Sequence, residues 1–512
     1  MGYARVRCRG ERGLEAPPVS VEVQLASGLP AFNIVGLAET TVRESRDRVR
    51  GALASLGYDF PVSRIVVNLA PADLPKSGGR FDLAIALAIL AASGQLRSTV
   101  LDDTECFGEL TLAGEVAPVA GVLPAAIAAA AAGRSVIVGA CDAHIAALAP
   151  GARAHAVATL ADAVDHLSGK QSLAVVASRR VVDDDAVPVP DLADVRGQQG
   201  AKRALEVAAA GEHNLLLIGP PGSGKSMLAA RLPGLVPEMT EAEVLEVATI
   251  RSVTGHAPSK TRWHQRPFRA PHHSASSAAL VGGGSRPRPG EISRAHHGVL
   301  FLDELPEFSR HALEMLREPL ETGRVHIARA NAYVSFPARF QLVAAMNPCP
   351  CGYLGDPDTL CRCSQDQVLR YQGRLSGPLL DRIDLSVSLG RVPFKTLRSQ
   401  SSRPESPPVA ARVRDARGRA HHRQGCSNAR LSPARLGALL EGADAAQALL
   451  ERAANNMHLS ARACHRVLRV ARTVSDLAGR DYIAEVDMAE ALSLRAPTIA
   501  PAGHHSPNTQ SR

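Results

Sequence analysis

The sequence predicts an α/β protein in which a core with a parallel sheet lies between an N-terminal α/β domain and a C-terminal helical segment. Three observations support this fold class. Short apolar strand-like segments alternate with Ala- and Leu-rich helical stretches in the first third of the chain. In the middle, a glycine-rich loop directly follows an apolar strand. Near the C-terminus, apolar residues recur with the helical period.

The N-terminal α/β domain is expected to span residues 1–168. Its β-rich pieces lie at residues 21–25, 64–68 and 135–138, where β-branched and apolar residues gather. Residues 81–92 are almost entirely Ala, Leu and Ile, which favours a buried helix. Strands and helices therefore alternate in this domain.

The boundaries beyond this domain follow changes in composition. Residues 169–190 contain three consecutive aspartates and a Val-Pro-Val-Pro run, so we expect an exposed linker. Residues 397–410 are rich in Ser and Pro and form a second break. These breaks leave a core over residues 191–396, a helical segment over 411–496, and a tail over 497–512 that is expected to be disordered.

Composition limits the classes of function. The 512 residues are 45% hydrophobic, which is ample for several cores, while 3% aromatics argues against base-stacking platforms. A net charge of +8 suits a polyanionic partner or simply a solvated basic surface. The N-terminal residues lack an apolar signal core, and the Ala-rich run at 125–132 is too short to span a bilayer. We expect a cytoplasmic protein without a membrane partner.

The glycine-rich loop has every residue that a phosphate-binding loop requires. It follows the apolar strand Leu215–Ile218. Its glycines let backbone N–H groups surround a polyphosphate, Lys225 can reach the β- and γ-phosphates, and the Ser226 hydroxyl can ligate Mg²⁺. A chance glycine-rich turn is disfavoured by the strand–loop–helix context. The loop comprises Gly219, Pro220, Pro221, Gly222, Ser223, Gly224, Lys225 and Ser226.

Two further apolar runs end in residues suited to hydrolysis of a nucleoside triphosphate. Val299–Leu302 is followed by Asp303, which can hold the Mg²⁺ shell, and by Glu304, which can polarise an attacking water. Residues 340–346 end at Asn347, whose amide could orient that water. The sequence therefore predicts an ATPase that uses ATP and Mg²⁺.

Several motifs around this core resemble the YifB/ComM family, in the magnesium-chelatase-like branch of the AAA+ ATPases. The resemblance covers about residues 3 to 496. It implies an ATP-driven hexameric ring that acts on DNA without sequence preference, as a helicase in branch migration during DNA uptake and recombination. The motifs lie at residues 194–198, 219–226, 272–273, 289–293, 347–352 and 375–382.

The same resemblance assigns roles to single residues. Asn347 matches the first sensor, Arg462 the second sensor, and Arg382 the arginine finger that reaches the γ-phosphate of a neighbouring subunit. A guanidinium delivered in this way stabilises the charge of the phosphoryl transition state. The alternative for Arg382 is a structural ion pair with Asp381 or Asp384. Arg462 begins an arginine stripe, continued by Arg466, Arg469 and Arg472, that is typical of a solvated helix face.

A predicted hairpin precedes the sensor strand. Residues 325–327 and 333–336 are strand-like and flank a short polar segment. In related ring helicases such a hairpin points into the central pore, so Arg324 and Arg329 could touch phosphates, as could Arg286 and Arg288 in the long insertion before Asp303. Ordinary surface arginines are the alternative.

Four of the nine cysteines form two C-x-C pairs, Cys349 with Cys351 and Cys361 with Cys363. Four thiolates could close tetrahedrally on a structural Zn²⁺, although common zinc sites space each pair more widely. Four reduced, unligated thiols are the alternative.

Residues 108–116 and 118–121 resemble the Lon-protease-like domain. Lon enzymes use a Ser–Lys dyad, but the lysine would fall near Leu123, where none stands. Ser77 adjoins Lys76, yet neighbouring residues of a strand point to opposite faces. We therefore expect a Lon-like fold without protease activity.

Two rivals remain beside the DNA motor. One is a magnesium-chelatase-type motor subunit that acts on a protein or tetrapyrrole partner; the fused N-terminal domain and the absence of an integrin-like metal-binding domain disfavour it. The other is an ATP-dependent peptidase, which the missing lysine disfavours.

Overall fold

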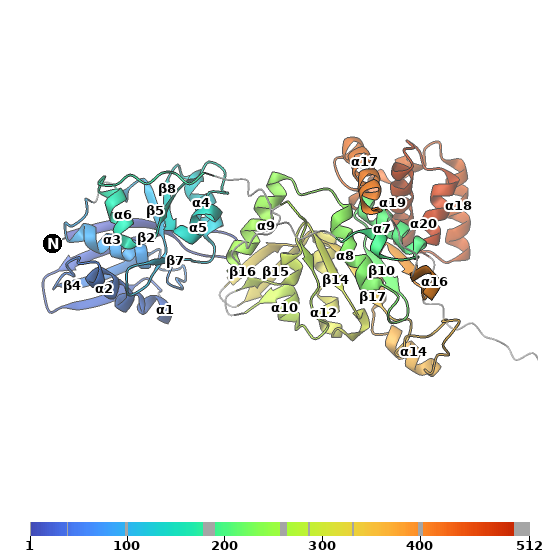
Figure 1. The fold of residues 1–512 in the computed structure, drawn as a ribbon, viewed down its shortest axis with the longest axis horizontal. Helices are drawn as coiled ribbons and strands as arrows, with labels where there is room; N and C mark the ends of the chain where they lie inside the picture. The colour runs from blue at the N-terminus through green and yellow to red at the C-terminus, as the bar shows by residue number, and fades with distance from the viewer. Residues whose placement is uncertain are drawn as a thin grey trace, which may run out of the picture. The chain divides into compact units, whose positions relative to one another are not determined.

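The computed structural model describes residues 2–37, 39–97, 101–177, 190–255, 264–284, 287–329, 332–397 and 403–495 (Figure 1). The chain divides into two compact units. The first comprises Met1–Ala186 and Glu241–Trp263, and the second comprises Val187–Thr240 and His264–Arg512. The tail at 497–512 and the aspartates at 183–185 lie outside the described residues.

The first unit contains a seven-stranded mixed sheet in the order β3-β4-β2-β1-β5-β8-β9. The β1–β2 and β2–β4 pairs are antiparallel, and the other pairs are parallel. All three strands predicted for this domain are confirmed, as parts of β2, β4 and β8. The strands are β1 (Gly2–Arg9), β2 (Pro18–Ala26), β3 (Ala31–Val35), β4 (Arg64–Ala70), β5 (Thr104–Phe107), β8 (Ser135–Gly139) and β9 (Arg153–Val157).

The core of this unit is built around α3 (Asp82–Ala92), which the sequence predicted as a buried helix. Every residue of α3 is buried, and the helix packs on β1 and β2. An all-apolar helix gains free energy from burial on every side, which explains this central position. The other elements are α1 (Thr40–Arg43), α2 (Ser45–Ser55), α4 (Val122–Ala131), α5 (Ala140–Ala146), α6 (Leu160–Leu167), β6 (Glu109–Leu110) and β7 (Val116–Ala117).

One helix of the first unit comes from the middle of the sequence. α9 (Glu241–Val253) falls within the range 191–396 that composition assigned to the core, but it packs on α4. The backbone N–H of Gly121 donates to the carbonyl of Ser252 at 2.9 Å, and Ala248 is buried in the core of the first unit. Composition could not show this, because α9 has the same character as its neighbours in sequence.

The linker also differs in part from its prediction as exposed chain. The backbone N–H of Val176 donates to the carbonyl of Ala154 at 2.8 Å, and Leu173 and Val176 pack on the core of the first unit. The start of the linker is thus packed on the first unit through its apolar side chains. No helix among the described residues combines the length and apolar character that crossing a bilayer requires.

The second unit contains a five-stranded parallel sheet in the order β11-β14-β17-β10-β18. The three central strands are buried along their whole length and are almost continuously apolar, as expected for a parallel sheet covered on both faces. This confirms the predicted parallel core. The strands are β10 (Leu215–Ile218), β11 (Phe268–Arg269), β14 (Val299–Leu302), β17 (Gln341–Met346) and β18 (Leu385–Ser388).

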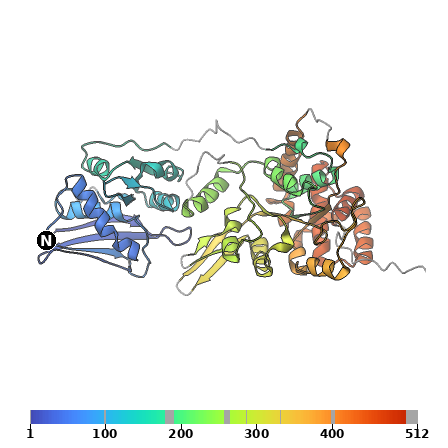
Figure 2. The ribbon, with the colours of Figure 1, turned by 60° about the horizontal axis from the view of Figure 1, so that its bottom comes forward.

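Helices and two small hairpins complete the core of the second unit. The hairpin of β15 and β16 projects from the body of this unit (Figure 2). The helices are α7 (Gln199–Gly211), α8 (Lys225–Leu235), α10 (Ser277–Val281), α11 (Glu291–Arg294), α12 (Arg310–Glu314), α13 (Arg317–Thr322), α14 (Gln365–Gln372), α15 (Gly377–Leu380) and α16 (Phe394–Leu397). The hairpins pair β12 (Gly282–Gly283) with β13 (Arg288–Pro289), and β15 (Arg324–Arg329) with β16 (Ala332–Pro337).

Four helices make up most of the C-terminal segment: α17 (Ser406–Gln424), α18 (Asp444–Asn456), α19 (Ala461–Leu477) and α20 (Glu485–Ser493). α17 begins inside the range 397–410 that was expected to be a break. The prolines near its start do not prevent this, since the first turn of a helix needs no intrahelical N–H donor.

Three of the four arginines of the stripe on α19 are not solvated, contrary to the typical interpretation, while the first, Arg462, is exposed. Arg472 is 2% exposed and pairs with Asp476 at 2.7 Å. Arg469 donates to the carbonyl of Leu431, and Arg466 donates to that of Ile383. These guanidinium groups bond backbone carbonyls and carboxylates of neighbouring segments, which a helical-wheel pattern cannot show.

Candidate nucleotide-binding and hydrolysis site

The glycine-rich loop joins β10 to the first residue of α8, as the sequence predicts. Gly222 and Gly224 have φ angles of 76° and 90°, a conformation that other L-residues rarely adopt. A Cβ atom at either glycine would meet nothing within 4 Å, so backbone conformation rather than close packing requires glycine at both positions. The backbone is therefore shaped to receive a ligand at the N-terminus of α8, where helix geometry favours an anion.

Lys225 is held inside this loop. Its ammonium group donates to the carbonyls of Gly219 at 2.8 Å and Pro220 at 3.0 Å, and to Oδ1 of Asn347 at 3.2 Å. Burial lowers the pKa of Lys225, although Asp303 and Glu304 act in the opposite direction. The hydroxyl of Ser223, in the same loop, is buried and has no hydrogen-bond partner among the described residues. A buried cation and an unpaired hydroxyl together fit a polyphosphate.

The predicted Mg²⁺ ligands lie side by side. The hydroxyl of Ser226 donates to Oδ2 of Asp303 at 2.7 Å, although the two residues are 77 positions apart in sequence. Asp303 follows β14, and Asn347 follows β17, the strand between β14 and β10. Because all three strands are parallel, their carboxyl ends meet at one edge of the sheet. The order of the strands thus brings together Lys225, Ser226, Asp303 and Asn347.

Glu304 occupies a constrained position beside them. Its φ angle is 53°, uncommon for a residue other than glycine. Its Oε2 lies 2.9 Å from Nδ1 of His273, and the ring of His273 packs against that of His272 in a tilted arrangement, with 4.1 Å between centroids. The sequence flagged both histidines as part of a motif but did not pair either with Glu304.

Gln198 makes further contacts near the site that the sequence did not reveal. Its side-chain amide donates to the carbonyl of Ser223 at 3.2 Å and to that of Gly390 at 2.7 Å. It thereby ties the phosphate-binding loop to the segment after β18. The motif at 194–198 pointed to this region, but only the fold shows which groups it supports.

Arg382 is paired, but not with the residues that adjoin it in sequence. Its guanidinium contacts the carboxylate of Glu321 and donates to the carbonyls of Arg317 at 3.2 Å and Pro378 at 2.5 Å. The alternative to a finger was a structural ion pair, and Arg382 does form one, but with Glu321 rather than with Asp381 or Asp384. Asp384 instead accepts a hydrogen bond from the backbone N–H of Asn214 and lies 3.8 Å from Arg466.

Arg462 is not brought to this cluster by any contact. It is exposed in the first turn of α19 and makes no hydrogen bond or ion pair within the part of the chain that the structure describes. Its assignment as a second sensor stays a prediction.

The predicted hairpin before the sensor strand is confirmed as β15 and β16. Arg324 is exposed at its base and donates to the hydroxyl of Ser335 on the opposite strand at 3.2 Å. Tyr333 is 70% exposed and stacks on His326 at 5.7 Å between centroids. Arg288 is exposed in β13, whereas Arg286 and the side chain of Arg329 lie outside what the structure describes.

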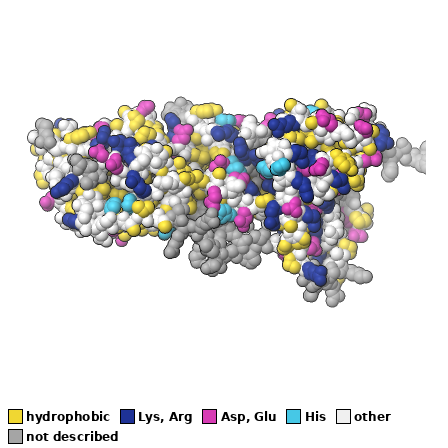
Figure 3. All heavy atoms as spheres, turned by 90° about the horizontal axis from the view of Figure 1, so that it is seen from above, with side chains coloured by type: hydrophobic (Ala, Val, Ile, Leu, Met, Phe, Trp, Pro, Cys, Tyr) yellow, Lys and Arg dark blue, Asp and Glu magenta, His cyan; other side chains and the backbone are white. Residues whose placement is uncertain are grey.

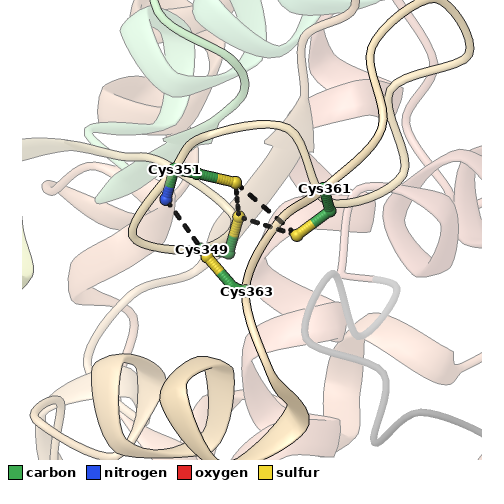
Figure 4. A group of neighbouring side chains, drawn as sticks. All are labelled: Cys349, Cys351, Cys361 and Cys363. Atoms are coloured by element: carbon green, nitrogen blue, oxygen red, sulfur yellow. Dashed lines mark hydrogen bonds between the residues drawn. The ribbon is translucent and has the colours of Figure 1, made fainter.

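The four clustered cysteines converge in the loop between β17 and α14 (Figure 4). The sulfur of Cys349 lies 3.4 Å from that of Cys351 and 3.6 Å from that of Cys361, and the backbone N–H of Cys351 points at the sulfur of Cys363. Tetrahedral Zn²⁺ with bonds of ~2.3 Å has sulfurs ~3.8 Å apart. The arrangement is therefore compatible with zinc.

The thiols of this cluster differ widely in pKa. Burial raises the pKa of Cys351, but backbone N–H donors of Arg362 and Tyr353 outweigh it and lower the value to about 6. A backbone contact with Cys363 lowers the pKa of Cys361, yet burial and the neighbouring sulfurs raise it to about 12. A divalent cation would remove this conflict by stabilising every thiolate at once.

Surface charge does not reveal a partner by itself. On the face drawn in Figure 3, basic and acidic side chains are interspersed over both units rather than separated into areas of one sign. In the first unit, Lys76 is fully buried and its ammonium group donates to the carbonyl of Pro71. Leu123, near which the resemblance to Lon enzymes would place a lysine, is also fully buried.

Comparisons with known proteins cover nearly the whole chain. The family described as "Magnesium chelatase, subunit ChlI" matches residues 191–397, "Subunit ChlI of Mg-chelatase" matches 21–142, and "Magnesium chelatase, subunit ChlI C-terminal" matches 403–495. The chain is 49% identical over 503 residues to "Competence protein ComM" of Haemophilus influenzae, covering 97% of this chain and 98% of that protein. It is 47% identical over 504 residues to "Uncharacterized protein YifB" of Escherichia coli, covering 97% of each.

A more distant likeness concerns one part of the chain. The "Magnesium-chelatase 38 kDa subunit" of Cereibacter sphaeroides is 27% identical over 210 residues, which is 38% of this chain and 56% of that protein.

Proposed function

Because this chain belongs to the YifB/ComM family of magnesium-chelatase-like proteins, which are AAA+ ATPases, we propose that it is an ATP-hydrolysing ring motor that acts on DNA. The observation that carries the ATPase part is the contact between Ser226 and Asp303 next to the enclosed Lys225. These residues come from separate segments and converge on a glycine-rich loop.

Each group at this edge of the sheet has a defined task. Backbone N–H groups of the loop and Lys225 would hold the phosphates of ATP, while Ser226 and Asp303 would hold Mg²⁺, whose charge neutralises the phosphate oxygens. Glu304 accepts a proton from the attacking water, and the Asn347 amide orients that water. To do this, Glu304 must give up or share its contact with His273.

The arginine finger requires a second copy of the chain. The family resemblance assigns Arg382 to the site of a neighbouring subunit, and Arg462 contributes from the C-terminal helices, which act as a lid. A closed ring supplies each site with one finger. We therefore propose a homo-oligomer, a hexamer as in related ring motors.

The DNA part of the proposal rests on the family and on the hairpin of β15 and β16. One relative is named a competence protein, and the family resemblance implies branch migration of DNA. The exposed Arg324 on a projecting hairpin suits a phosphate backbone, which gives binding without sequence preference. We place this motor in the cytoplasm, with the first unit as a Lon-like domain that lacks the dyad and stabilises the ring or binds DNA.

The test is the steady-state ATPase rate with and without single-stranded and forked DNA, at two salt concentrations. We expect stimulation by DNA that falls as salt rises, because counterions compete for phosphate contacts. Turnover that is indifferent to DNA would leave an ATPase but remove the DNA motor.

A chelatase-type motor subunit is the second candidate, favoured by the match to the Cereibacter sphaeroides subunit. It predicts stimulation by a protein or tetrapyrrole partner instead of DNA. The same ATPase assay with these additions separates the two.

We further propose that Cys349, Cys351, Cys361 and Cys363 hold one structural Zn²⁺. Four sulfur ligands leave no open position, so the ion would stabilise the loop rather than take part in catalysis. Elemental analysis of purified protein should find about one zinc per chain, falling in a Cys361→Ser variant. Less than about a tenth of a zinc per chain in the unaltered protein would reject the site.

A further inference from the structure

We propose that Glu321 is the positioning residue of the arginine finger: its carboxylate holds the guanidinium of Arg382 in the orientation that serves the neighbouring subunit. This inference rests on the proposed role of Arg382 in trans.

The contacts of Arg382 define this role. One helix, α13, supplies two of them: the carboxylate of Glu321 at Nη2 and the carbonyl of Arg317 at Nε. These two residues are four positions apart, one helical turn, and so lie on one face of α13. The third contact, from Nη1, is the carbonyl of Pro378 in α15, four residues before Arg382 itself.

A count of donors shows what is left for a ligand. A guanidinium has five N–H groups, and the three contacts use one each on Nε, Nη1 and Nη2. Two N–H groups remain, one on each terminal nitrogen. Two free donors are the number that a bidentate contact with phosphate oxygens needs. Arg382 can therefore be held by its own chain and still meet a phosphate.

The exposure of the two side chains bears on whether Glu321 acts on the fold or on the placement of Arg382. The side chain of Arg382 is 11% exposed, whereas that of Glu321 is 57% exposed. A lone surface ion pair contributes little to stability, and Glu321 is not needed to fill a core. Its effect should instead appear in the placement of the finger, since an error of ~1 Å in a reacting group can cost ~100-fold in rate.

The location of α13 gives this contact a further consequence. The helix ends at Thr322, Gly323 follows with a φ angle of 68°, and β15 begins at Arg324. The helix α13, which contacts Arg382, is thus joined directly to the hairpin proposed to touch DNA.

The experiment compares Glu321→Gln with Glu318→Gln, an exposed glutamate one turn earlier on the same helix. In the assembled protein we expect kcat of Glu321→Gln to fall ~10- to 100-fold with KM for ATP changed less than ~2-fold. Glu318→Gln should keep the unaltered rate. A rise in kcat would show that Glu321 restrains the finger, and an unchanged kcat would show no role; either overturns the proposal.

Mixed assemblies distinguish positioning from damage to the variant's own site. Co-assembly with Lys225→Ala subunits, which have an intact finger but no working loop, should restore turnover at the sites of Glu321→Gln. Co-assembly with Arg382→Ala subunits should not. Failure of rescue by Lys225→Ala places the defect in the variant's own fold or site and overturns the proposal.

A third mixture tests the premise separately. Arg382→Ala and Lys225→Ala subunits are each inactive alone, and together they should regain activity if Arg382 acts in trans. If this mixture stays inactive, the proposed function fails. If it works while Glu321→Gln behaves like the unaltered protein, only the positioning role fails.

Discussion

A cluster of charged side chains in the first unit and the polar contacts at the candidate site of the second unit differ in how far they are buried. In the first unit Glu105 is 1% exposed and accepts from Arg9 at 2.7 Å and from Arg134 at 2.9 Å. All three residues belong to β1, β5 or the approach to β8, within one sheet. At the candidate site of the second unit the polar contacts include an exposed partner: Ser226 with Asp303, Glu304 (53% exposed) with His273, and Arg382 with Glu321 (57% exposed).

This difference separates charges that specify a fold from charges that are available for chemistry. The charges of Arg9, Glu105 and Arg134 pair with one another, so removing one of them leaves an uncompensated charge in a core. The contacts at the candidate site occupy groups that ATP, Mg²⁺ or a neighbouring subunit could take over. The first kind should matter for stability and the second for turnover.

The largest effect is expected for Lys225→Ala. Removing the ammonium group from the loop should lower ATP turnover by roughly a thousand-fold or more, because phosphoryl transfer depends on positioned charge. The melting temperature should stay close to that of the unaltered protein. Turnover and thermal unfolding measured on the same preparation check both halves, and full activity would refute the assignment of the site.

Glu105→Gln tests whether the buried charges of the first unit matter for stability. It leaves Arg9, 8% exposed, without its countercharge, at an expected cost of ~3–5 kcal/mol to the first unit. Hydrogen exchange resolved by unit should show the loss in the first unit alone. A variant of full stability would mean that water or a nearby group compensates Arg9.

The two units should also respond to pH with opposite signs. In the first, burial raises the pKa of Asp142 to about 6, against the opposing effects of the Val119 N–H and of Arg80. In the second, burial opposes the shift, but Arg417, Arg430, the Ser427 hydroxyl and Arg266 lower the pKa of Glu212 to about 2. A pKa unit corresponds to ~1.4 kcal/mol, so each shift is equivalent to about 3 kcal/mol.

The signs follow from linkage. Because its folded pKa is raised, Asp142 contributes stability below pH ~4 that is lost as pH rises through about 6, so Asp142→Asn should stabilise the protein at pH 7 only. Because its folded pKa is lowered, Glu212 contributes above pH ~4.5 and loses this as pH falls toward 2. Glu212→Gln should therefore be destabilised at pH 7 and equal to the unaltered protein near pH 2. Denaturant unfolding at several pH values checks both.

Arg324→Ala should give the smallest effect. Removing this guanidinium should reduce the slope of log affinity against log salt by about 1 for each subunit whose Arg324 contacts a phosphate, with similar weakening for every DNA sequence. Arg310→Ala, an exposed arginine outside the hairpin, is the matched control. Equal slopes for both variants would remove the hairpin from the DNA interface.

Much of the fold and part of the site could be predicted from local pattern. The buried strands β10 and β14, the helix α3 and the hairpin before the sensor strand were all visible, because burial on two faces or alternation leaves a signature within a few residues. The phosphate-binding loop was visible because its chemistry requires glycines and a lysine at fixed spacing.

The rest depended on contacts between distant segments. Sequence placed Arg382 beside Asp381 and Asp384, but helix geometry turned it toward Glu321, 61 positions away. The α19 arginines lie on one side of a helix, and only packing against the segments of Leu431 and Ile383 showed that this side is covered. α9 resembled the core in composition and became part of the first unit.

By itself the sequence identified the most strongly patterned strands and helices, and it predicts which residues hold a nucleotide, since these follow from side-chain chemistry over a few positions. Tertiary structure decided which charges meet. The partner of Glu304 and the support of the phosphate-binding loop by Gln198 arise from the order of strands in one parallel sheet, and the contacts of Arg382 arise from the packing of α13 and α15. That order brings together ends of strands that lie far apart in the chain, and it leaves no trace in local composition.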